Sequence, residues 1–458
     1  MAVAAVALVA RGLGDRRRVQ RLTQLVASLA ERWSQSLPKA LARWAPLKAA
    51  YRFFDNRNVT PAGMLAAAWP ACREQLPADG PVLLIQDTTT ITIKRSATQD
   101  LGPVGNGQGR GLLLHSVLAA SAAGTPIGVP CQLLWTRDAD GPHRDSRRQR
   151  PIEEKESYRW LDLEQQSLAS LPPGVPAITV ADREADSCEL FAQARPAHAY
   201  LLIRAAQSDR SVDADGGKLA ARLAQQPVLG SYTLEVAPTP KRTGRQARCE
   251  VRLAPVVLQP PQNRAAGSPR LAPVPVTAIL ASELAAPPEE EPLRWLLLTS
   301  WPVRSFADAR QVLVWYSCRW LIERFHFVLK TGCGVEELQL RTAARLENAI
   351  STYSLVAARL LWLTYLAREQ PAAPCSLAFT QSEWETLVCM ATKQARPPST
   401  PPRLREAVRL VAKLGGFLAR KGDGEPGPTA LWTGLQRLAD YVAARTLFQP
   451  PPPVTGSG

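Results

Sequence analysis

The sequence predicts an α/β fold with helical regions at both ends of the chain. Short apolar runs in the first half alternate with a helical pattern, which is the order typical of α/β proteins. Basic amphipathic segments precede these runs, and Leu- and Ala-rich helical segments follow them. Strands are expected at residues 81–86, 112–119, 126–135, 177–181 and 200–204, with a helix at 153–170.

The first sixty residues predict small basic helices. Asp15 is a suitable N-cap, and apolar residues from Leu22 to Trp33 recur behind it at helical spacing. Such helices commonly hold DNA, although a solvated amphipathic pair would give the same pattern. The cations of the first turns are Arg16, Arg17, Arg18 and Arg21, and those of the second stretch are Lys39, Arg43, Lys48 and Arg52.

Composition limits the kinds of protein this can be. A chain of 458 residues has room for two to four domains, and its net charge of +15 favours a polyanionic partner such as nucleic acid. An Arg-rich genome could also produce that charge. The eight cysteines form no CxxC pair, which argues against zinc and favours free thiols in a reducing cytoplasm. No apolar run is long enough to predict a membrane span.

Two carboxylates stand at the ends of predicted strands. Asp87 follows the first apolar run, and Asp182 follows the run at 177–181. Carboxylates at strand ends of α/β sheets commonly face a site, although either residue could instead close a turn or cap a helix. Residues 206–299 then predict a mainly β insertion with Pro-rich pieces, because strand-like runs recur at 231–236, 248–253, 276–280 and 295–299.

Residues 315–330 contain no Pro or Gly and predict one helix. At about 100° per residue its polar side chains share one narrow stripe, with apolar residues such as Phe325 on the opposite face. A solvated face with an Arg319–Glu323 pair would explain the stripe equally well. The stripe consists of Tyr316, Arg319, Glu323, His326 and Lys330.

The remaining residues predict further helices. One is expected at 343–366, and two more at 403–419 and 429–448, before a disordered tail. In the last helix Leu431, Leu435, Leu438 and Val442 recur at helical spacing, which fits either a core or a dimer surface.

Asp87, Asp182 and Glu323 together would form an oxygen-ligand site for Mg²⁺ or Mn²⁺. Two such ions can activate water and stabilise the leaving oxygen of a phosphodiester. At this point the sequence resembles a known family, the bacterial cut-and-paste DDE transposases of the insertion-sequence-four group, and among them most of all the transposase of transposon five. The resemblance rests on Tyr316, Arg319, Glu323 and Lys330 at the family spacing, on Asp182-Arg-Glu-Ala-Asp186, and on shorter matches along nearly the whole chain.

The resemblance implies an RNase H-like core of the retroviral integrase type, interrupted by the β-rich insertion. It also implies a homodimer that binds the inverted ends of an element, cleaves them through hairpins and joins them to target DNA. Arg319, Lys330, His326, Arg204 and Tyr316 would contact phosphates, and Trp295 would stack on a flipped base unless it packs in the core of the insertion. Two departures stand out, since Arg324 replaces a family acidic residue and Phe327 a family Lys.

Five regions follow from this interpretation. They are a DNA-binding region (1–65), a catalytic core in two parts (66–205 and 300–366), the insertion (206–299) and a dimerisation region with its tail (367–458). We expect a cytoplasmic, nucleoid-associated protein. A non-catalytic end-binding or inhibitory descendant of a transposase is the alternative, and a nuclease of another DNA transaction is a third possibility.

Overall fold

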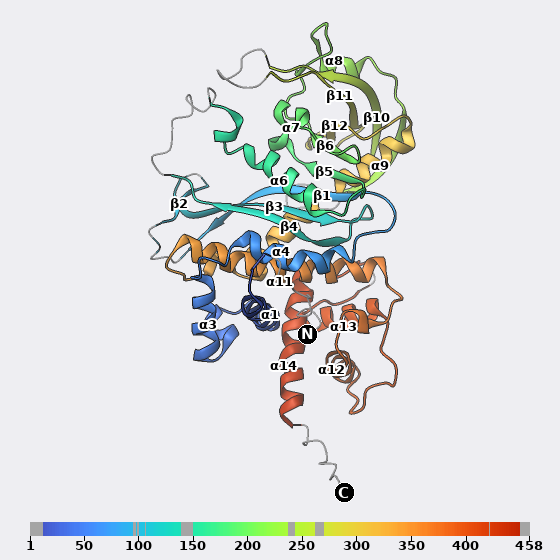
Figure 1. Ribbon diagram of the computed structural model, residues 1–458. Helices are drawn as coiled ribbons and strands as arrows, with labels where there is room; N and C mark the ends of the chain where they lie inside the picture. Colours follow the sequence, from blue (N-terminus) through green and yellow to red (C-terminus); the bar gives the residue numbers. More distant parts are fainter. Residues whose placement is uncertain are drawn as a thin grey trace.

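The computed structural model describes residues 12–448 except 95–97, 99, 106, 139–149, 237–242, 262–269 and 421. Within this part of the chain, helices cover both faces of a mixed sheet (Figure 1). The tail predicted to be disordered lies outside the described residues.

The N-terminal region is helical, as the sequence predicts. Asp15 caps its first helix by accepting a hydrogen bond from the backbone N–H of Arg17 at 2.8 Å. The predicted apolar face of this helix is buried, while Arg16, Arg17 and Arg21 are exposed. The helices are α1 (Arg16–Glu31), α2 (Leu37–Leu41), α3 (Trp44–Phe54) and α4 (Pro61–Arg73).

The five strands predicted in the first half are confirmed. In the sheet β3 is antiparallel to β1, whereas β5 is parallel to β1 and β6 is parallel to β5. The Gly-rich stretch after β1 is a turn that also supplies a short edge strand, β2. The strands are β1 (Val82–Thr92), β2 (Gly102–Val104), β3 (Gly109–Ala120), β4 (Pro126–Trp135), β5 (Ala177–Ala181) and β6 (Ala199–Arg204).

The strands of residues 206–299 extend this sheet and do not form one of their own. β12 pairs antiparallel with β6 through Leu297↔Arg204, which covers an edge that would otherwise expose unpaired backbone groups. β11 and β10 then continue the sheet. These elements are β7 (Ser211–Val212), β8 (Gly217–Lys218), α8 (Leu219–Ala224), β9 (Gly230–Val236), β10 (Arg245–Leu258), β11 (Val274–Glu283) and β12 (Arg294–Thr299).

The single helix predicted at 315–330 is wrong in detail, because the chain forms two helices and a π-turn there. α9 (Phe306–Ser317) is followed by α10 (Trp320–Phe327) and a π-turn over Val328–Gly332. At the junction the N–H groups of Cys318 and Arg319 bond to carbonyls three residues earlier, as in a 3₁₀ turn. Both residues keep helical dihedral angles, so the chain hardly departs from a helical path.

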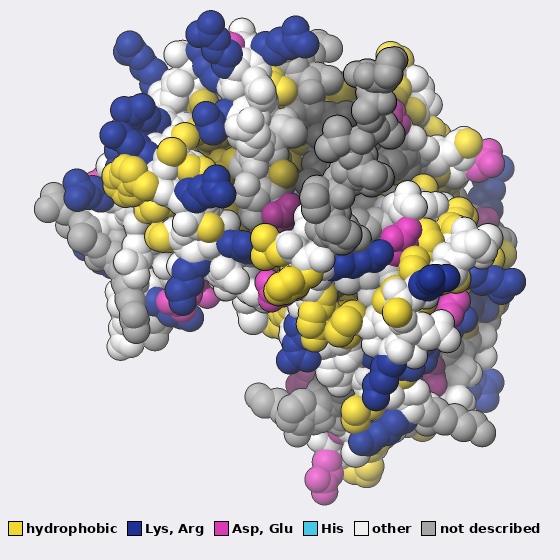
Figure 2. Space-filling model, turned by 90° about the horizontal axis from the view of Figure 1, so that it is seen from below, with side chains coloured by type: hydrophobic (Ala, Val, Ile, Leu, Met, Phe, Trp, Pro, Cys, Tyr) yellow, Lys and Arg dark blue, Asp and Glu magenta, His cyan; other side chains and the backbone are white. Residues whose placement is uncertain are grey.

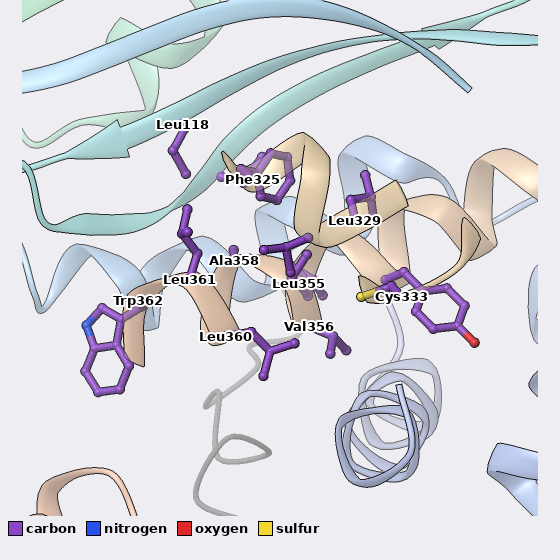
Figure 3. Packing of buried hydrophobic residues seen from close by; sticks show 14 of the residues in the cluster. Leu118, Phe325, Leu329, Cys333, Leu355, Val356, Ala358, Leu360, Leu361 and Trp362 are labelled. Carbon is purple, nitrogen blue, oxygen red and sulfur yellow. The ribbon is translucent and has the colours of Figure 1, made fainter. Parts of the chain in front are cut away.

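One long helix, α11 (Ala343–Glu369), lies beneath the sheet and contacts both terminal regions. Leu355, Val356 and Leu361 pack with Leu118 of β3 and Phe325 of α10 in the main core (Figure 3). By length and composition α11 could cross a membrane, but 83% of its most apolar stretch is buried inside the protein, as expected of a core helix. On the opposite face of the sheet lie α6 (Tyr158–Ser170) and α7 (Cys188–Ala192) (Figure 1).

The described C-terminal residues form three helices, not the two that were predicted. These are α12 (Gln381–Thr392), α13 (Leu404–Leu414) and α14 (Pro428–Phe448). Leu431, Leu435 and Leu438 on α14 are each at most 3% exposed. Their helical spacing therefore marks a core face within one subunit.

Candidate active site

Three parallel strands, β1, β5 and β6, present functional side chains at their carboxyl ends. β1 and β5 pair through Ile85↔Val180, so Asp87 and Asp182 lie at the same level two residues later. β5 and β6 pair through Ala181↔Ile203, which brings Arg204 next to Asp182. Asp182 also caps a short 3₁₀ turn by accepting the N–H of Glu184 at 2.9 Å.

Glu323 on α10 completes the acidic group. Arg319, which precedes it by one turn, forms ion pairs with Glu323 and, at 3.6 Å, with Asp87. The Arg319 side chain is only 13% exposed. Its positively charged guanidinium therefore bridges the strand carboxylate of Asp87 and the helix carboxylate of Glu323.

The Asp87 carboxyl has a raised pKa. Burial is the largest cause that raises its pKa to about 7, and the carboxylates of Asp182 and Glu323 raise it further. Among the described residues no three acidic, Cys or His side chains converge closely enough to hold an ion in their present positions. Carboxylate oxygens are the ligands that hard divalent ions prefer.

Tyr316, at the end of α9, lies beside the same group. Its side chain is buried, and the hydroxyl has no hydrogen-bond partner of good geometry among the described atoms. Burial raises the pKa of Tyr316, while the charges of Arg319 and Arg204 oppose that change. Trp295 packs edge to face on Tyr316 with ring centroids 5.4 Å apart, so it is both a packing residue and a neighbour of the site.

Two members of the predicted stripe behave differently. Lys330 is half-buried, donates a hydrogen bond to the carbonyl of Thr90 at 2.8 Å and lies 3.3 Å from Glu336. His326 turns into the core, where its Nε2 lies 3.3 Å from the Ser116 hydroxyl. Burial lowers the pKa of His326 to about 3, so this inward-facing ring is neutral, and its contact with a phosphate stays a prediction.

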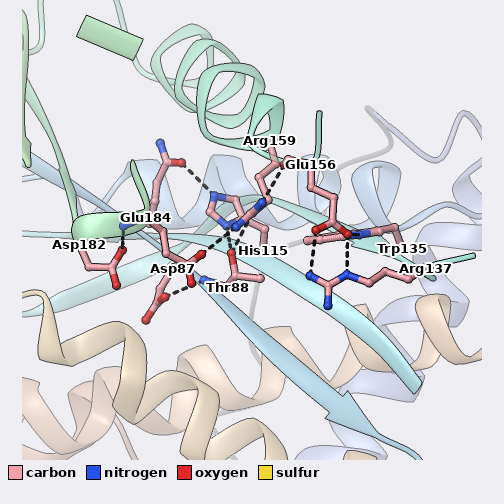
Figure 4. A network of polar contacts seen from close by, with 10 residues as sticks. Asp87, Thr88, His115, Trp135, Arg137, Glu156, Arg159, Asp182 and Glu184 are labelled. Carbon is pink, nitrogen blue, oxygen red and sulfur yellow. Dashed lines mark hydrogen bonds and ion pairs between the residues drawn. The ribbon is translucent and has the colours of Figure 1, made fainter. Parts of the chain in front are cut away.

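Arg159 on α6 links the two Asp-bearing segments (Figure 4). Its Nε donates to Thr88 Oγ1 at 3.0 Å, and its Nη2 donates to Glu184 at 2.9 Å. Thr88 follows Asp87 directly, and the N–H of Glu184 is the group that holds Asp182. The guanidinium also lies over the rings of Trp135 and Trp160, at 5.7 and 5.4 Å from their centroids.

The hydrogen bonds that begin at Arg159 determine which atom of Thr88 and of His115 carries each proton. Because Thr88 Oγ1 accepts from Arg159, its own proton points to His115 Nδ1 at 2.8 Å. The other ring nitrogen of His115 then donates to Gln86 Oε1 at 3.0 Å. Burial and the neighbouring Arg159 keep the pKa of His115 low, so this ring is neutral.

Sequence reasoning did not single out Arg159, although its partner Glu184 lies inside the Asp182–Asp186 match. It also did not single out Trp44, which is 70% exposed at the start of α3 among Arg43 and Lys48. An apolar residue at the head of a basic helix was the available signal. Figure 2 shows the underside of the molecule, on which Lys and Arg side chains gather at the upper left.

Three protein-family models match the chain. Residues 5–59 match the family described as Transposase DNA-binding, residues 161–359 match Transposase DDE domain, and residues 355–448 match Transposase Tn5 dimerisation domain. The middle match includes Asp182 and Glu323 but begins after Asp87. Together the matches run in the order that the fold shows, from basic N-terminal helices through the sheet to the C-terminal helices. The chain therefore belongs to the Tn5-type DDE transposases, enzymes that bind and cleave DNA and form homodimers.

Proposed function

We propose that this transposase works by cut and paste, with Asp87, Asp182 and Glu323 as its catalytic carboxylates. The observation that carries the proposal is that two neighbouring parallel strands and α10 bring Asp182 and Glu323 near enough to Asp87 to add to the effect of burial, and together these effects raise the pKa of Asp87 to about 7. Neighbouring carboxylates in a buried position are typical of sites where a divalent cation neutralises their charge.

The strand order supports an RNase H-like core as part of the proposal. β3 and β1 are antiparallel, β5 and β6 follow in parallel, and α10 returns the third carboxylate to the sheet. We further propose that residues 1–65 bind DNA, that 66–205 with 300–366 catalyse, that 206–299 are an insertion and that 367–448 dimerise. The family matches at the two ends of the chain support the first and last of these assignments.

DDE transposases generally use divalent metal ions. We propose that Asp87, Asp182 and Glu323 hold two Mg²⁺ or Mn²⁺ ions, which when bound would lower the pKa of attacking water and stabilise charge on the leaving oxygen. Arg319 would then release Asp87 and Glu323 and turn to a phosphate. The side chain of Glu323 is 35% exposed, which leaves it room to rotate toward the strand carboxylates.

The DNA contacts follow from the groups around this centre. Arg319, Arg204 and Lys330 would hold phosphates, and the Tyr316 hydroxyl would donate the hydrogen bond that it lacks now. The N-terminal helices would contact the element's ends through Arg16, Arg17, Arg18, Arg21 and the exposed Trp44.

In strand transfer the element's 3′ hydroxyl gives up its proton as its oxygen bonds to a target phosphorus. The bond from that phosphorus to the target's 3′ oxygen breaks, and the released oxygen takes up a proton.

Hairpin formation would use Trp295. A tight hairpin cannot keep every base stacked, and an aromatic face can replace lost stacking by roughly 1–3 kcal/mol. Trp295 is partly buried against Tyr316, so its ring is already oriented beside the phosphate contacts.

One assay tests these assignments on labelled element ends in Mg²⁺. Asp87→Ala, Asp182→Ala and Glu323→Ala should bind the ends and give no nicked product, because each loses an anionic ligand. Trp295→Ala should nick the ends and accumulate nicked product with few hairpins. Substantial nicking by any of the three carboxylate variants would refute the metal site, and normal hairpin yield from a stable Trp295→Ala protein would refute the stacking role.

A non-catalytic end-binding descendant is the second candidate. The presence of all three carboxylates and of Arg319 among them supports the active enzyme instead. Cleavage of arbitrary duplex without preference for the ends would favour a nuclease.

A further inference from the structure

A hollow of about 480 Å³ lies beside α10, outside the group of carboxylates. Ligand pockets of proteins commonly have volumes of this order. The turn between β3 and β4, the junction of α9 and α10, and the C-terminal end of α11 form its walls. Its chemically distinctive lining residues are Trp320, Arg324, Tyr365, Arg368 and Glu369.

The lining combines cations with aromatic rings. Trp320 is 59% exposed, and Arg324 and Arg368 are exposed as well. Arg368 lies over the Tyr365 ring at 4.8 Å, and both arginines act to lower the pKa of Tyr365 against the larger, opposite effect of burial. Among the described residues the side chain of Arg324 has no hydrogen-bond or ion-pair partner. Paired cations and an exposed indole are the groups that hold the phosphates and bases of a DNA strand.

Arg319 connects this hollow to the chemistry. Its guanidinium pairs with Asp87 and Glu323 and lies 5.9 Å from the Trp320 ring centroid. A strand in the hollow would therefore lie next to Arg319, which pairs with two of the carboxylates. Of the proposed contacts to the element's end, Arg204 lies beside β12 and Lys330 lies against β1, and neither of them lines the hollow.

We propose that this hollow binds the target DNA strand during strand transfer. The inference rests on the proposed function, because joining needs a second DNA at the same centre, in line with the attacking 3′ oxygen. The end already occupies its own contacts, so the second strand must approach from a different wall. Arg324 and Arg368 give this wall the positive charge that a DNA strand requires.

The decisive experiment compares cleavage with joining. Arg324→Glu/Arg368→Glu should bind and cleave ends within about twofold of wild type, yet lose roughly tenfold or more in joining to a target plasmid, because reversed charges repel the strand. Part of this loss should return at high target concentration. Arg270→Glu, an exposed residue on the connection between β10 and β11, is the matched control and should join normally.

A second arm does not depend on charge reversal. A photo-crosslinking residue in place of the exposed Glu369 should label radioactive target DNA in full-length protein with pre-cleaved ends bound. Crosslinks to the end instead of the target, or normal joining by the double variant, would overturn the inference. If Asp87→Ala still joined ends, the proposed function itself would fail, which is a separate result.

Discussion

At the scale of single residues, Arg159 connects the two strand segments that carry the acidic side chains. It contacts neither substrate nor a carboxylate of the site, and acts through Thr88 and Glu184. Groups that orient ligands from behind commonly contribute 10–100-fold to metal affinity or activity. We therefore regard Arg159 as a positioning residue.

Arg159→Gln should weaken Mn²⁺ binding and end cleavage by about 10–100-fold while leaving end binding intact. Cleavage should recover in part at high Mn²⁺, and Arg159→Lys should lie in between, since an ammonium cannot reach both partners with fixed geometry. Free Mn²⁺ measured by electron paramagnetic resonance reports the affinity directly. Arg137→Gln is the matched control, because Arg137 belongs to the same cluster but pairs with Glu156. Unchanged Mn²⁺ affinity in folded Arg159→Gln would contradict the assignment.

His326 predicts a pH dependence of stability. Its folded pKa of about 3 lies below the ordinary value of 6.5, so the unfolded chain binds the extra proton between these values. The stability contributed by the neutral ring is complete above pH 6.5 and is lost as the pH falls toward 3. Between pH 7 and pH 5 wild type should lose about 2 kcal/mol more than His326→Gln.

Urea unfolding of the two proteins at a series of pH values measures this difference. The buried His115 is present in both proteins, and since burial is the largest cause of its low pKa, most of its contribution cancels. Parallel stability curves for wild type and His326→Gln would show that the ring is protonated or exposed in the folded protein.

A helical wheel predicted which polar residues share a stripe but not which of them turn inward. Tyr316, Arg319 and Glu323 lie together as expected. His326 belongs to the same stripe, yet Ser116 on β3 provides a partner that draws it into the core. Only the packed sheet supplies that partner, so spacing along the helix could not reveal it.

At the scale of elements, the helix α14 has a buried apolar face and an exposed apolar C-terminal end. Leu435 and Leu438 are each 1% exposed, whereas Leu447 and Phe448 are 82% and 87% exposed. The dimerisation match ends at residue 448. Two exposed apolar residues at that position are therefore the better candidates for contact between subunits.

Leu447→Asp/Phe448→Asp should remain folded and bind single ends but form few paired-end complexes on a native gel. Leu435→Asp should instead unfold the C-terminal region, because it buries an unpaired charge. Thermal unfolding separates the two effects. Normal pairing by the folded double variant would place the contact elsewhere.

Several element boundaries had local signals that could have been used. Thr380 and Glu383 form a capping box at the start of α12, as Ser305 and Asp308 do for α9. The glycine directly after Leu414 has a structural reason that the sequence does not reveal. A Cβ on Gly415 would lie 1.8 Å from the carbonyl oxygen of Ala430, so α13 and α14 cross with backbones in contact.

At the scale of the whole molecule, charge predicted the partner while patterning predicted the layers. The net charge of +15 is consistent with the transposase DNA-binding match. Local patterns could not show that residues 206–299 join the main sheet, because the pairing of β12 with β6 joins residues almost a hundred positions apart.

The N-terminal arginines predict how binding responds to salt. Arg16→Gln/Arg17→Gln/Arg21→Gln should lower the slope of log affinity against log salt by about 0.9 for each phosphate that is no longer neutralised, on ends and random duplex alike. A triple variant at other exposed arginines (Arg270, Arg396 and Arg403) serves as the control. An unchanged slope would mean that these arginines do not contact phosphate.

Substitution is a better test here than truncation. The N-terminal helices pack on α11, where Asn348 donates hydrogen bonds to the carbonyls of Phe54 and Val59 at 3.0 Å each. Deleting residues 1–60 would expose this buried face and remove both acceptors. Failure of such a fragment to bind DNA would then reflect damage to the core as much as the missing arginines.

The position of α11 also sets an order of events during synthesis. The helices α1 and α3 find the long helix on which they pack only after residues 55–342 have been made, because that partner begins at Ala343. Until then the basic helices have no completed core beneath them. A nascent chain should therefore gain its ability to hold DNA late, close to the moment when Glu323 and the rest of the centre are in place.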